Sequence, residues 1–206
     1  MSVQAESGAR RTLFITSLVG FMVAMEITII SIARSQISEA FPSAEAATLS
    51  WVITAYNIGV ASLLLPAGWM ADRYGRKKVF LWGLVAFIFG SLLSGLATSP
   101  ALLIGARVVQ SIGGAAQYPA GLALLLSAFP LERRMRAIGV WGAVSGLAAA
   151  LAPSLGALLI EGFGWRSVFL INVPVALLAL IAGRSWLIES RSQEVSDRVD
   201  LVSVPM

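Results

Sequence analysis

Long uncharged runs of apolar residues constrain this sequence more than any other feature. Between Val79 and Leu131 the only charged residue is Arg107. A hydrocarbon layer about 30 Å thick needs about 20 apolar residues of helix to cross it, so this run is too long for one crossing and must turn, at residues 97–100. Only 13% of the residues are charged, against roughly 25% in soluble domains. The sequence therefore predicts a chain whose solvent is a lipid bilayer.

Six apolar runs of suitable length, uncharged except for Glu26, Arg107 and Arg184, predict an all-α polytopic membrane protein. The expected transmembrane helices lie at about residues 13–33, 48–70, 79–97, 100–129, 137–160 and 167–188. They form one six-helix domain, residues 12–189, between an N-terminal segment of residues 1–11 and a polar tail of residues 190–206. Prolines interrupt four of the expected helices and predict kinks there, at Pro66, Pro119, Pro153 and Pro174.

The distribution of basic residues predicts the orientation, because cytoplasmic loops are enriched in Lys and Arg. With a cytoplasmic N-terminus, twelve of the fifteen basic residues fall inside, whereas only Arg34 and Arg166 fall outside and Arg107 lies within a helix. Both termini are therefore expected in the cytoplasm. The six tryptophans lie near expected helix ends, where an indole ring favours the membrane interface.

The residue types that are missing exclude several function classes. The chain has no Cys and no His, which removes disulfides, thiol chemistry and the usual ligands of zinc and haem. No credible pair of nucleophile and base is found, so an enzyme is not expected, and neither is a cofactor or a metal site. The basic residues lie in short clusters between apolar runs rather than on a soluble domain, so nucleic acid is not an expected partner.

The segment between the second and third expected helices has a specific pattern. Basic residues in a cytoplasmic turn are explained by topology alone, but the spacing of residues 68–78, GWMADRYGRKK, is not. The segment resembles the cytoplasmic signature loop of the major facilitator superfamily, carried here by Gly68, Asp72, Arg73, Gly75 and Arg76. The resemblance implies that the acidic residue faces a helix of the second half of such a transporter, near a positive helix end.

Two further segments resemble motifs of the same superfamily. Residues 107–114, RVVQSIGG, look like its fourth-helix motif, with Ser111 where glycine is usual. Small residues in the fifth expected helix resemble the motif associated with antiporters, at Gly139, Gly142, Gly146, Pro153 and Gly156. Such residues also permit close helix packing, so this segment alone does not separate a functional role from a packing role.

The first expected helix is similar to the signature of the fourteen-helix drug:proton antiporters. Residues 25–33, MEITIISIA, carry Glu26 where that family usually has aspartate, and Arg34 and Ser35 replace its leucine-proline end. Residues 165–174, WRSVFLINVP, resemble the start of that family's sixth helix. The resemblance implies half of a major facilitator fold, made of two three-helix repeats, and multidrug efflux in exchange for protons.

Glu26 and Arg107 are charged residues inside expected transmembrane helices, and such residues are functional candidates by default. We predict that they couple protons to transport, since a carboxylate can gain and lose a proton; the alternative is an ion pair that only holds two helices together. Gln110 and Gln117 share a helix face with Arg107. They are expected to line a cavity, with Asn57 as a further candidate.

Transporters of this superfamily have twelve or fourteen crossings, twice or more the six expected here. The chain is therefore expected to act with a complementary C-terminal half, in a bacterial inner (plasma) membrane, on protons and a small-molecule substrate. Two alternatives remain open: a six-helix protein that works as a homodimeric channel or small transporter, and a truncated product without function.

Overall fold

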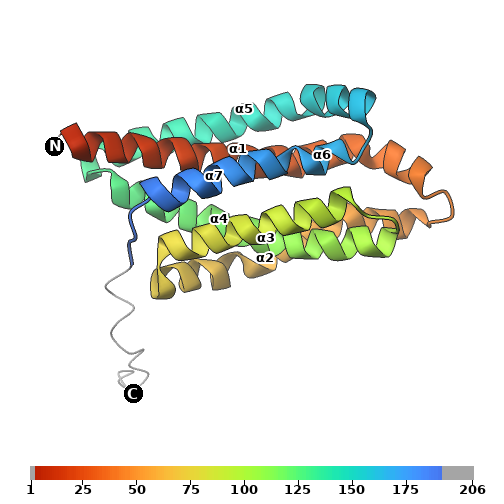
Figure 1. Cartoon of the computed structure of the whole chain (residues 1–206), viewed down its shortest axis with the longest axis horizontal. Coiled ribbons are helices and arrows are strands. Elements are labelled where there is room, and N and C mark those ends of the chain that lie inside the picture. The colour runs from red at the N-terminus through yellow and green to blue at the C-terminus, as the bar shows by residue number, and fades with distance from the viewer. Residues whose placement is uncertain (1–2, 192–206) are drawn as a thin grey trace, which may run out of the picture.

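The computed structural model describes residues 3–191, which form a bundle of long helices running side by side (Figure 1). Helices α6 and α7 follow one another in a single rod, so seven helical segments make six rods. The segments are α1 (Val3–Ala40), α2 (Ala46–Tyr74), α3 (Arg76–Gly95), α4 (Pro100–Ala128), α5 (Leu131–Phe163), α6 (Ser167–Leu170) and α7 (Asn172–Trp186). The predicted all-α six-helix architecture is confirmed.

Short turns with suitable residues join these helices. A single residue, Gly75, separates α2 from α3, and its φ of 118° lies in a region that side chains other than glycine rarely adopt. At the start of α4, the Ser99 hydroxyl accepts a hydrogen bond from the Leu102 amide at 3.2 Å. Pro100 follows at the first helical position, where a missing N–H costs nothing.

Three of the four prolines lie inside continuous helices, and the fourth lies next to a break in its helix. Pro66, Pro119 and Pro153 lie inside continuous helices. The sixth rod is interrupted at Ile171, between α6 and α7, which places Pro174 in the first turn of α7. At this break Pro174 has no N–H to donate to the carbonyl oxygen of Leu170, four positions earlier.

Glycines allow α3 and α4 to pack backbone against backbone. A Cβ atom added to Gly90 would lie 2.5 Å from the amide nitrogen of Gln110, and one added to Gly113 would lie 2.5 Å from that of Phe87. Real Cβ atoms do not approach so closely, so any larger residue would push the two helices apart. Small residues at the contact are the usual means by which transmembrane helices approach each other.

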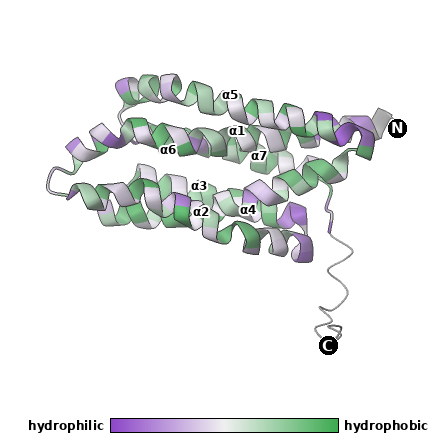
Figure 2. Ribbon diagram, turned by 180° about the vertical axis from the view of Figure 1, so that it is seen from behind, coloured by the Kyte–Doolittle hydropathy of each residue, from purple (hydrophilic) through white to green (hydrophobic). Residues whose placement is uncertain are grey.

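Figure 2 shows mostly apolar residues along the rods, with hydrophilic residues gathered near their ends. Leu65 is 83% exposed and Phe163 is 78% exposed, whereas Glu26 and Arg107 are buried. Within the described residues, five helical rods are long and apolar enough to cross a membrane. Helix α4 is as long as α2, with 29 residues each. It is not one of these five because its polar residues lower its mean hydropathy. The chain is a multi-pass membrane protein.

Two of the six tryptophans, Trp141 and Trp165, are buried against neighbouring helices rather than exposed on the surface of the bundle. The Trp141 indole donates a hydrogen bond to the carbonyl oxygen of Thr16 at 3.1 Å, so it joins α5 to α1. The polar group of this buried ring therefore has a hydrogen-bond partner inside the bundle.

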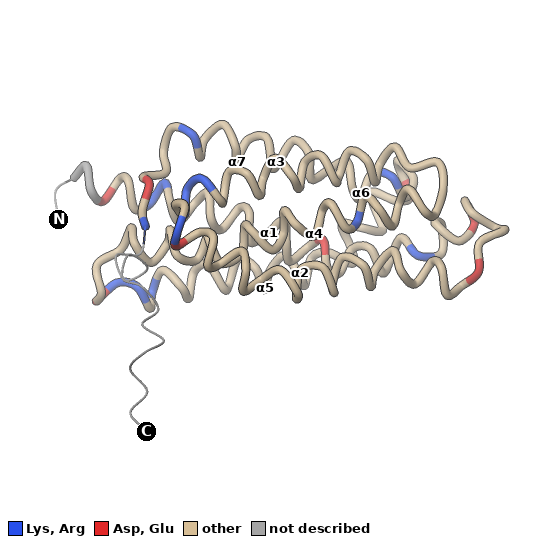
Figure 3. Tube along the Cα trace, turned by 90° about the horizontal axis from the view of Figure 1, so that it is seen from below, with Lys and Arg blue, Asp and Glu red and all other residues tan. Residues whose placement is uncertain are grey.

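The helices extend beyond the predicted crossings. Helix α1 covers both the expected span of residues 13–33 and polar residues on either side, from Val3 to Ala40. Most of the predicted polar tail, residues 192–206, lies outside the described residues. Most Lys and Arg residues gather at the end of the bundle that holds the N-terminus, the α2–α3 turn and the end of α7 (Figures 1 and 3).

Candidate functional site

An ion pair lies in the interior of the bundle, where α1 faces α4. The carboxylate of Glu26 accepts a hydrogen bond from Nη1 of Arg107, although the two residues are 81 positions apart in the chain. The side chain of Glu26 is 1% exposed and that of Arg107 is 0% exposed. The structure therefore brings together the two residues that the sequence singled out as intramembrane charges.

The rest of the Arg107 guanidinium is held by α2 and α4. Its Nε donates to the carbonyl oxygen of Val52 at 2.9 Å, and its Nη1 donates to Oε1 of Gln110 at 2.6 Å. Its central carbon lies 4.2 Å from the centre of the Tyr56 ring, within the range of a cation–π contact. Nη2 has no hydrogen-bond partner among the described residues.

Asn172 is a third member of the site, and its role was missed in the sequence. Its Nδ2 donates to the second carboxylate oxygen of Glu26. The break at Ile171 makes Asn172 the first residue of α7, so α1 and α7 meet at this hydrogen bond. One signal could have identified it, because Asn172 is the only polar side chain between residues 168 and 182, and isolated polar residues in such runs are often functional.

Gln110 extends the network to α3. Its amide nitrogen donates to the hydroxyl of Ser91 at 2.9 Å while its oxygen accepts from Arg107. The side chains of Gln110 and Ser91 are both fully buried. The network therefore joins α1, α2, α3, α4 and α7 through hydrogen bonds, and Gln110 is part of it rather than part of an open wall.

The other two predicted cavity residues lie elsewhere. Gln117 is buried and donates to the carbonyl oxygen of Gly83 at 2.9 Å. It lines a hollow of about 10 Å³ between α1, α4 and α5, a space that suits one water molecule. Asn57 is exposed on α2 and does not contact the network. A role for either residue in substrate binding stays a prediction.

An apolar hollow of about 250 Å³ lies beside the site, between α1, α5 and the sixth rod. Asn172 is its one polar lining residue, and the same side chain contacts Glu26. The other lining residues are Phe21, Met22, Met25, Leu155, Leu159, Ile171 and Val175. A single side chain, that of Asn172, therefore lies between this apolar hollow and the buried carboxylate of Glu26.

The signature loop forms its own ion pair. The Asp72 carboxylate accepts hydrogen bonds from Nε and Nη2 of Arg76 at 3.0 and 2.8 Å. Arg73 stacks on aromatic rings instead, with its guanidinium carbon 5.1 Å from the Trp69 ring centre. Gly68 lies against Pro119 of α4, where an added Cβ would find ordinary contact.

The residues after α7 bind the same loop, and the sequence pattern did not indicate this. The Glu189 carboxylate accepts hydrogen bonds from the backbone amides of Lys77 and Lys78 at 2.9 and 3.2 Å. The Lys77 ammonium donates to the carbonyl oxygens of Arg184 and Leu187 at the end of α7. An anion is favoured at a helix N-terminus and a cation at a C-terminus. The Glu189 carboxylate therefore stabilises the start of α3, and the Lys77 ammonium stabilises the end of α7.

The predicted antiporter motif divides between two faces of α5. A Cβ added to Gly156 would come within 2.7 Å of Ile29, so this glycine packs against α1. Cβ atoms added to Gly139, Gly142 or Gly146 would meet nothing within 4 Å, and Pro153 is exposed on α5 as well. This stripe of small residues therefore has no neighbour among the described residues.

A buried carboxylate paired with a guanidinium, inside a helical bundle with an apolar outer surface, is typical of membrane transporters. Among the described residues, no group of three or more acidic side chains could hold a metal ion. A carboxylate can in general gain and lose a proton, and an ion pair can separate and form again, so the residues of this site allow both changes.

Comparison with known proteins identifies the family. The sequence profile of the Major Facilitator Superfamily matches residues 16–199. The chain belongs to this superfamily, and the resemblance seen in its motifs is confirmed.

Curated relatives are named as drug exporters and resistance proteins. The chain is 38% identical over 191 residues to the multidrug resistance protein Stp of Mycobacterium tuberculosis, covering 92% of this chain and 35% of that protein. It is 34% identical to the methylenomycin A resistance protein of Bacillus subtilis, covering 97% of this chain and 42% of the relative. The tetracenomycin C resistance and export protein of Streptomyces glaucescens is 36% identical, with 94% and 36% covered.

A solved structure shares the fold. The crystal structure of a peptide transporter POT superposes with a TM-score of 0.74 at 15% identity, over 84% of this chain and 37% of that one. The chain spans about a third of the length of the first curated relatives that it matches.

Proposed function

We propose that this chain is the N-terminal six-helix half of a proton-coupled transporter that exports drugs or other small apolar molecules. The observation that carries the proposal is the buried pair of Glu26 and Arg107, with Asn172 on the second carboxylate oxygen. The names of the relatives, which are multidrug resistance and export proteins, support drugs as substrates.

Proton uptake at this site has a physical consequence for the bundle. While Glu26 is ionised, the pair carries no net charge; a proton on Glu26 leaves the Arg107 cation without its counter-ion in the core. An uncompensated buried charge costs several kcal/mol unless water or another acceptor reaches it. Protonation therefore favours a conformation in which Arg107 is hydrated or paired elsewhere, and this preference links the proton to the conformation.

Transporters of this architecture work by rocking two halves about a site near the middle of the membrane. In this scheme the second half covers the face of α5 that carries Gly139, Gly142 and Gly146, where no neighbour is present. It also meets the Asp72 side of the signature loop. The greater length of the relatives supports a complementary half as the partner of this chain.

The test is drug-induced proton release in vesicles that contain this chain and a complementary half from a relative. Glu26→Gln keeps the shape of the side chain and removes its titration, so transport driven by the proton gradient is expected to stop. Glu26→Asp is expected to retain part of it. The double variant Glu26→Gln with Arg107→Gln removes both charges and controls for the cost of an unpaired guanidinium.

If Glu26→Gln exports and releases protons like the parent protein, the ion pair is only a connection between α1 and α4. Export by a purified homodimer of this chain, with no other half present, would instead assign it to the small symmetric transporters.

A further inference from the structure

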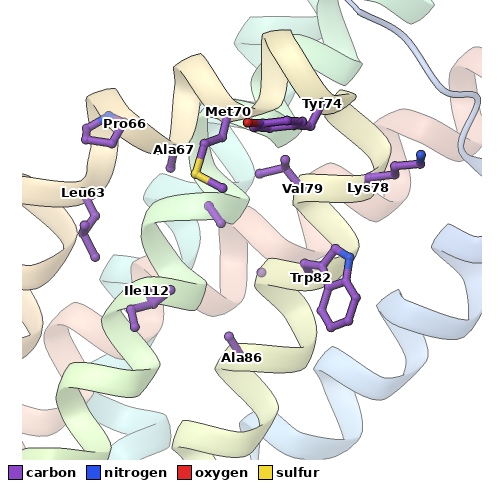
Figure 4. Close-up of a pocket in the computed structure, with 12 residues that line it drawn as sticks. Leu63, Pro66, Ala67, Met70, Tyr74, Lys78, Val79, Trp82, Ala86 and Ile112 are labelled. Carbon is purple, nitrogen blue, oxygen red and sulfur yellow. The ribbon is translucent and has the colours of Figure 1, made fainter.

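A groove of about 590 Å³ lies between α2 and α3 with α4 as its floor, apart from the ion-pair site (Figure 4). Its interior is lined by apolar and small residues, among them Leu63, Ala67, Ala86 and Ala116. The small side chains leave the space open. Its lining on α2 extends from Leu63 to Tyr74, which at 1.5 Å per residue is about 16 Å along the helix. This length is about half the thickness of the hydrocarbon layer, and so matches one leaflet.

The loop end of the groove has the residues of a membrane interface. Tyr74, Lys78 and Trp82 line this end, and Figure 4 shows the Tyr74 ring across it, with Lys78 and Trp82 on the α3 side. Trp82 is 72% exposed. Aromatic rings and long basic side chains are the residues that sit at headgroup level.

The basic residues of the loop differ in how they are neutralised. Arg76 is paired with Asp72, and Lys77 is bound to carbonyl oxygens at the end of α7. The Lys78 ammonium has no ion pair or hydrogen bond among the described residues, and neither has the guanidinium of Arg73, which lies 5.8 Å from the Tyr74 ring centre. Of these two cations without an anion, Lys78 lines the end of the groove, and Arg73 lies next to Tyr74, which lines the same end.

We propose that this groove binds an anionic phospholipid, with one acyl chain between α2 and α3 and the phosphate near Lys78 and Arg73. The apolar interior, its length and the unpaired positive charge at one end together fit a lipid of the leaflet on the signature-loop side. Basic pockets between transmembrane helices recognise acidic headgroups in this way.

Fluorescence quenching in nanodiscs tests the proposal with the full chain. The discs contain phosphatidylcholine with a small fraction of either brominated phosphatidylglycerol or brominated phosphatidylcholine. Trp82 is expected to be quenched more strongly by the brominated phosphatidylglycerol, and Trp82→Phe identifies its share of the signal. Lys78→Gln and Arg73→Gln are each expected to weaken the preference roughly fivefold, which corresponds to about 1 kcal/mol per basic side chain near the surface.

Two control variants separate the headgroup from the chain. Arg136→Gln removes an exposed charge from α5, away from the groove, and is expected to leave the preference unchanged. Ala86→Phe fills the groove and is expected to reduce quenching by both lipids while the charges remain.

Equal quenching by the two brominated lipids, or a preference that survives the loss of both Lys78 and Arg73, would overturn the proposal. So would loss of the quenching when a complementary half is added, since the groove would then belong to the contact between halves.

Discussion

Asn172 and Arg107 divide the two oxygens of the Glu26 carboxylate between them. Arg107 supplies the opposite charge. Asn172 fixes the orientation of the carboxylate, because Asn172 itself is held in place in the first turn of α7. A carboxylate held on both oxygens has one orientation in the core. This arrangement makes Asn172 a positioning residue for Glu26.

Asn172→Ala is expected to destabilise the chain, since one carboxylate oxygen of Glu26 then stays buried without a hydrogen-bond donor. The expected loss of unfolding free energy is about 1–3 kcal/mol. Thermal unfolding in detergent measures it. Ser17→Ala is the matched control, because the Ser17 hydroxyl is buried and has no hydrogen-bond partner in the described part of the chain. Equal stability of the two variants would contradict the positioning role.

The sequence allowed prediction of Glu26, Arg107 and Gln110 as residues of this site, but not of Tyr56 and Asn172. Glu26 and Arg107 are detectable because a charge inside an apolar run is costly wherever it lies. Tyr56 and Asn172 contact the pair only through the tertiary structure, and an aromatic ring or a single amide is common in transmembrane helices. Nothing in the linear sequence shows that Asn172 lies beside a residue 146 positions away.

At the scale of helices, the N-terminus of α3 depends on a residue that follows α7. The Glu189 carboxylate accepts hydrogen bonds from two amides in the first turn of α3. The carbonyl oxygen of Ser190 accepts a further one from the Arg76 amide at 3.0 Å. These three amides have no partner within α3 itself, so the segment after α7 completes the helix.

Glu189→Ala is expected to expose the amides of Lys77 and Lys78 to solvent, because no other acceptor for them is present among the described residues. Hydrogen exchange of peptides covering residues 76–79 measures this, and faster exchange is expected. Glu161→Ala, which removes a carboxylate without a described contact at the end of α5, is the control. Unchanged exchange in Glu189→Ala would show that water replaces the carboxylate without cost.

The helix ends were harder to predict than the helices. An apolar run marks the part of a helix that lies in lipid, but a helix continues into polar residues until its backbone is interrupted. Thus α1 reaches Ala40, and α2 continues through Asp72 and Arg73 until Gly75. The break at Ile171 lies three residues before Pro174, and the sequence did not show that the helix would be interrupted at this proline and not at the other three.

For the whole molecule, the gathering of Lys and Arg at one end of the bundle (Figure 3) bears on orientation. Basic residues are retained on the cytoplasmic side, so we expect both termini and the α2–α3 turn to face the cytoplasm. Reporter fusions measure this. Fusions after Lys77 and Arg134 are expected to report a cytoplasmic location, and fusions after Ser43 and Gly162 an external one. The reverse pattern at any of these sites would refute the orientation.

A further expectation concerns the chain expressed alone. Drug export is expected to be absent, because the stripe of small residues on α5 has no neighbouring helix among the described residues and the complementary half is not present. Drug accumulation in an efflux-deficient bacterial strain measures this, and co-expression of a complementary half is expected to restore export. Proton-dependent export by the chain alone would contradict the assignment as a half.

The glycine contact between α3 and α4 has a mechanical consequence. Where two backbones are in direct contact, few side chains lie between them that could change rotamer and let the helices slide. We therefore expect α3 and α4 to move as one rigid body. Spin labels attached at exposed positions of the two helices should keep the same separation in every state of a transport cycle. Any hinge must then lie in contacts made through larger and more adaptable side chains, such as those of α1 and the sixth rod around the ion pair.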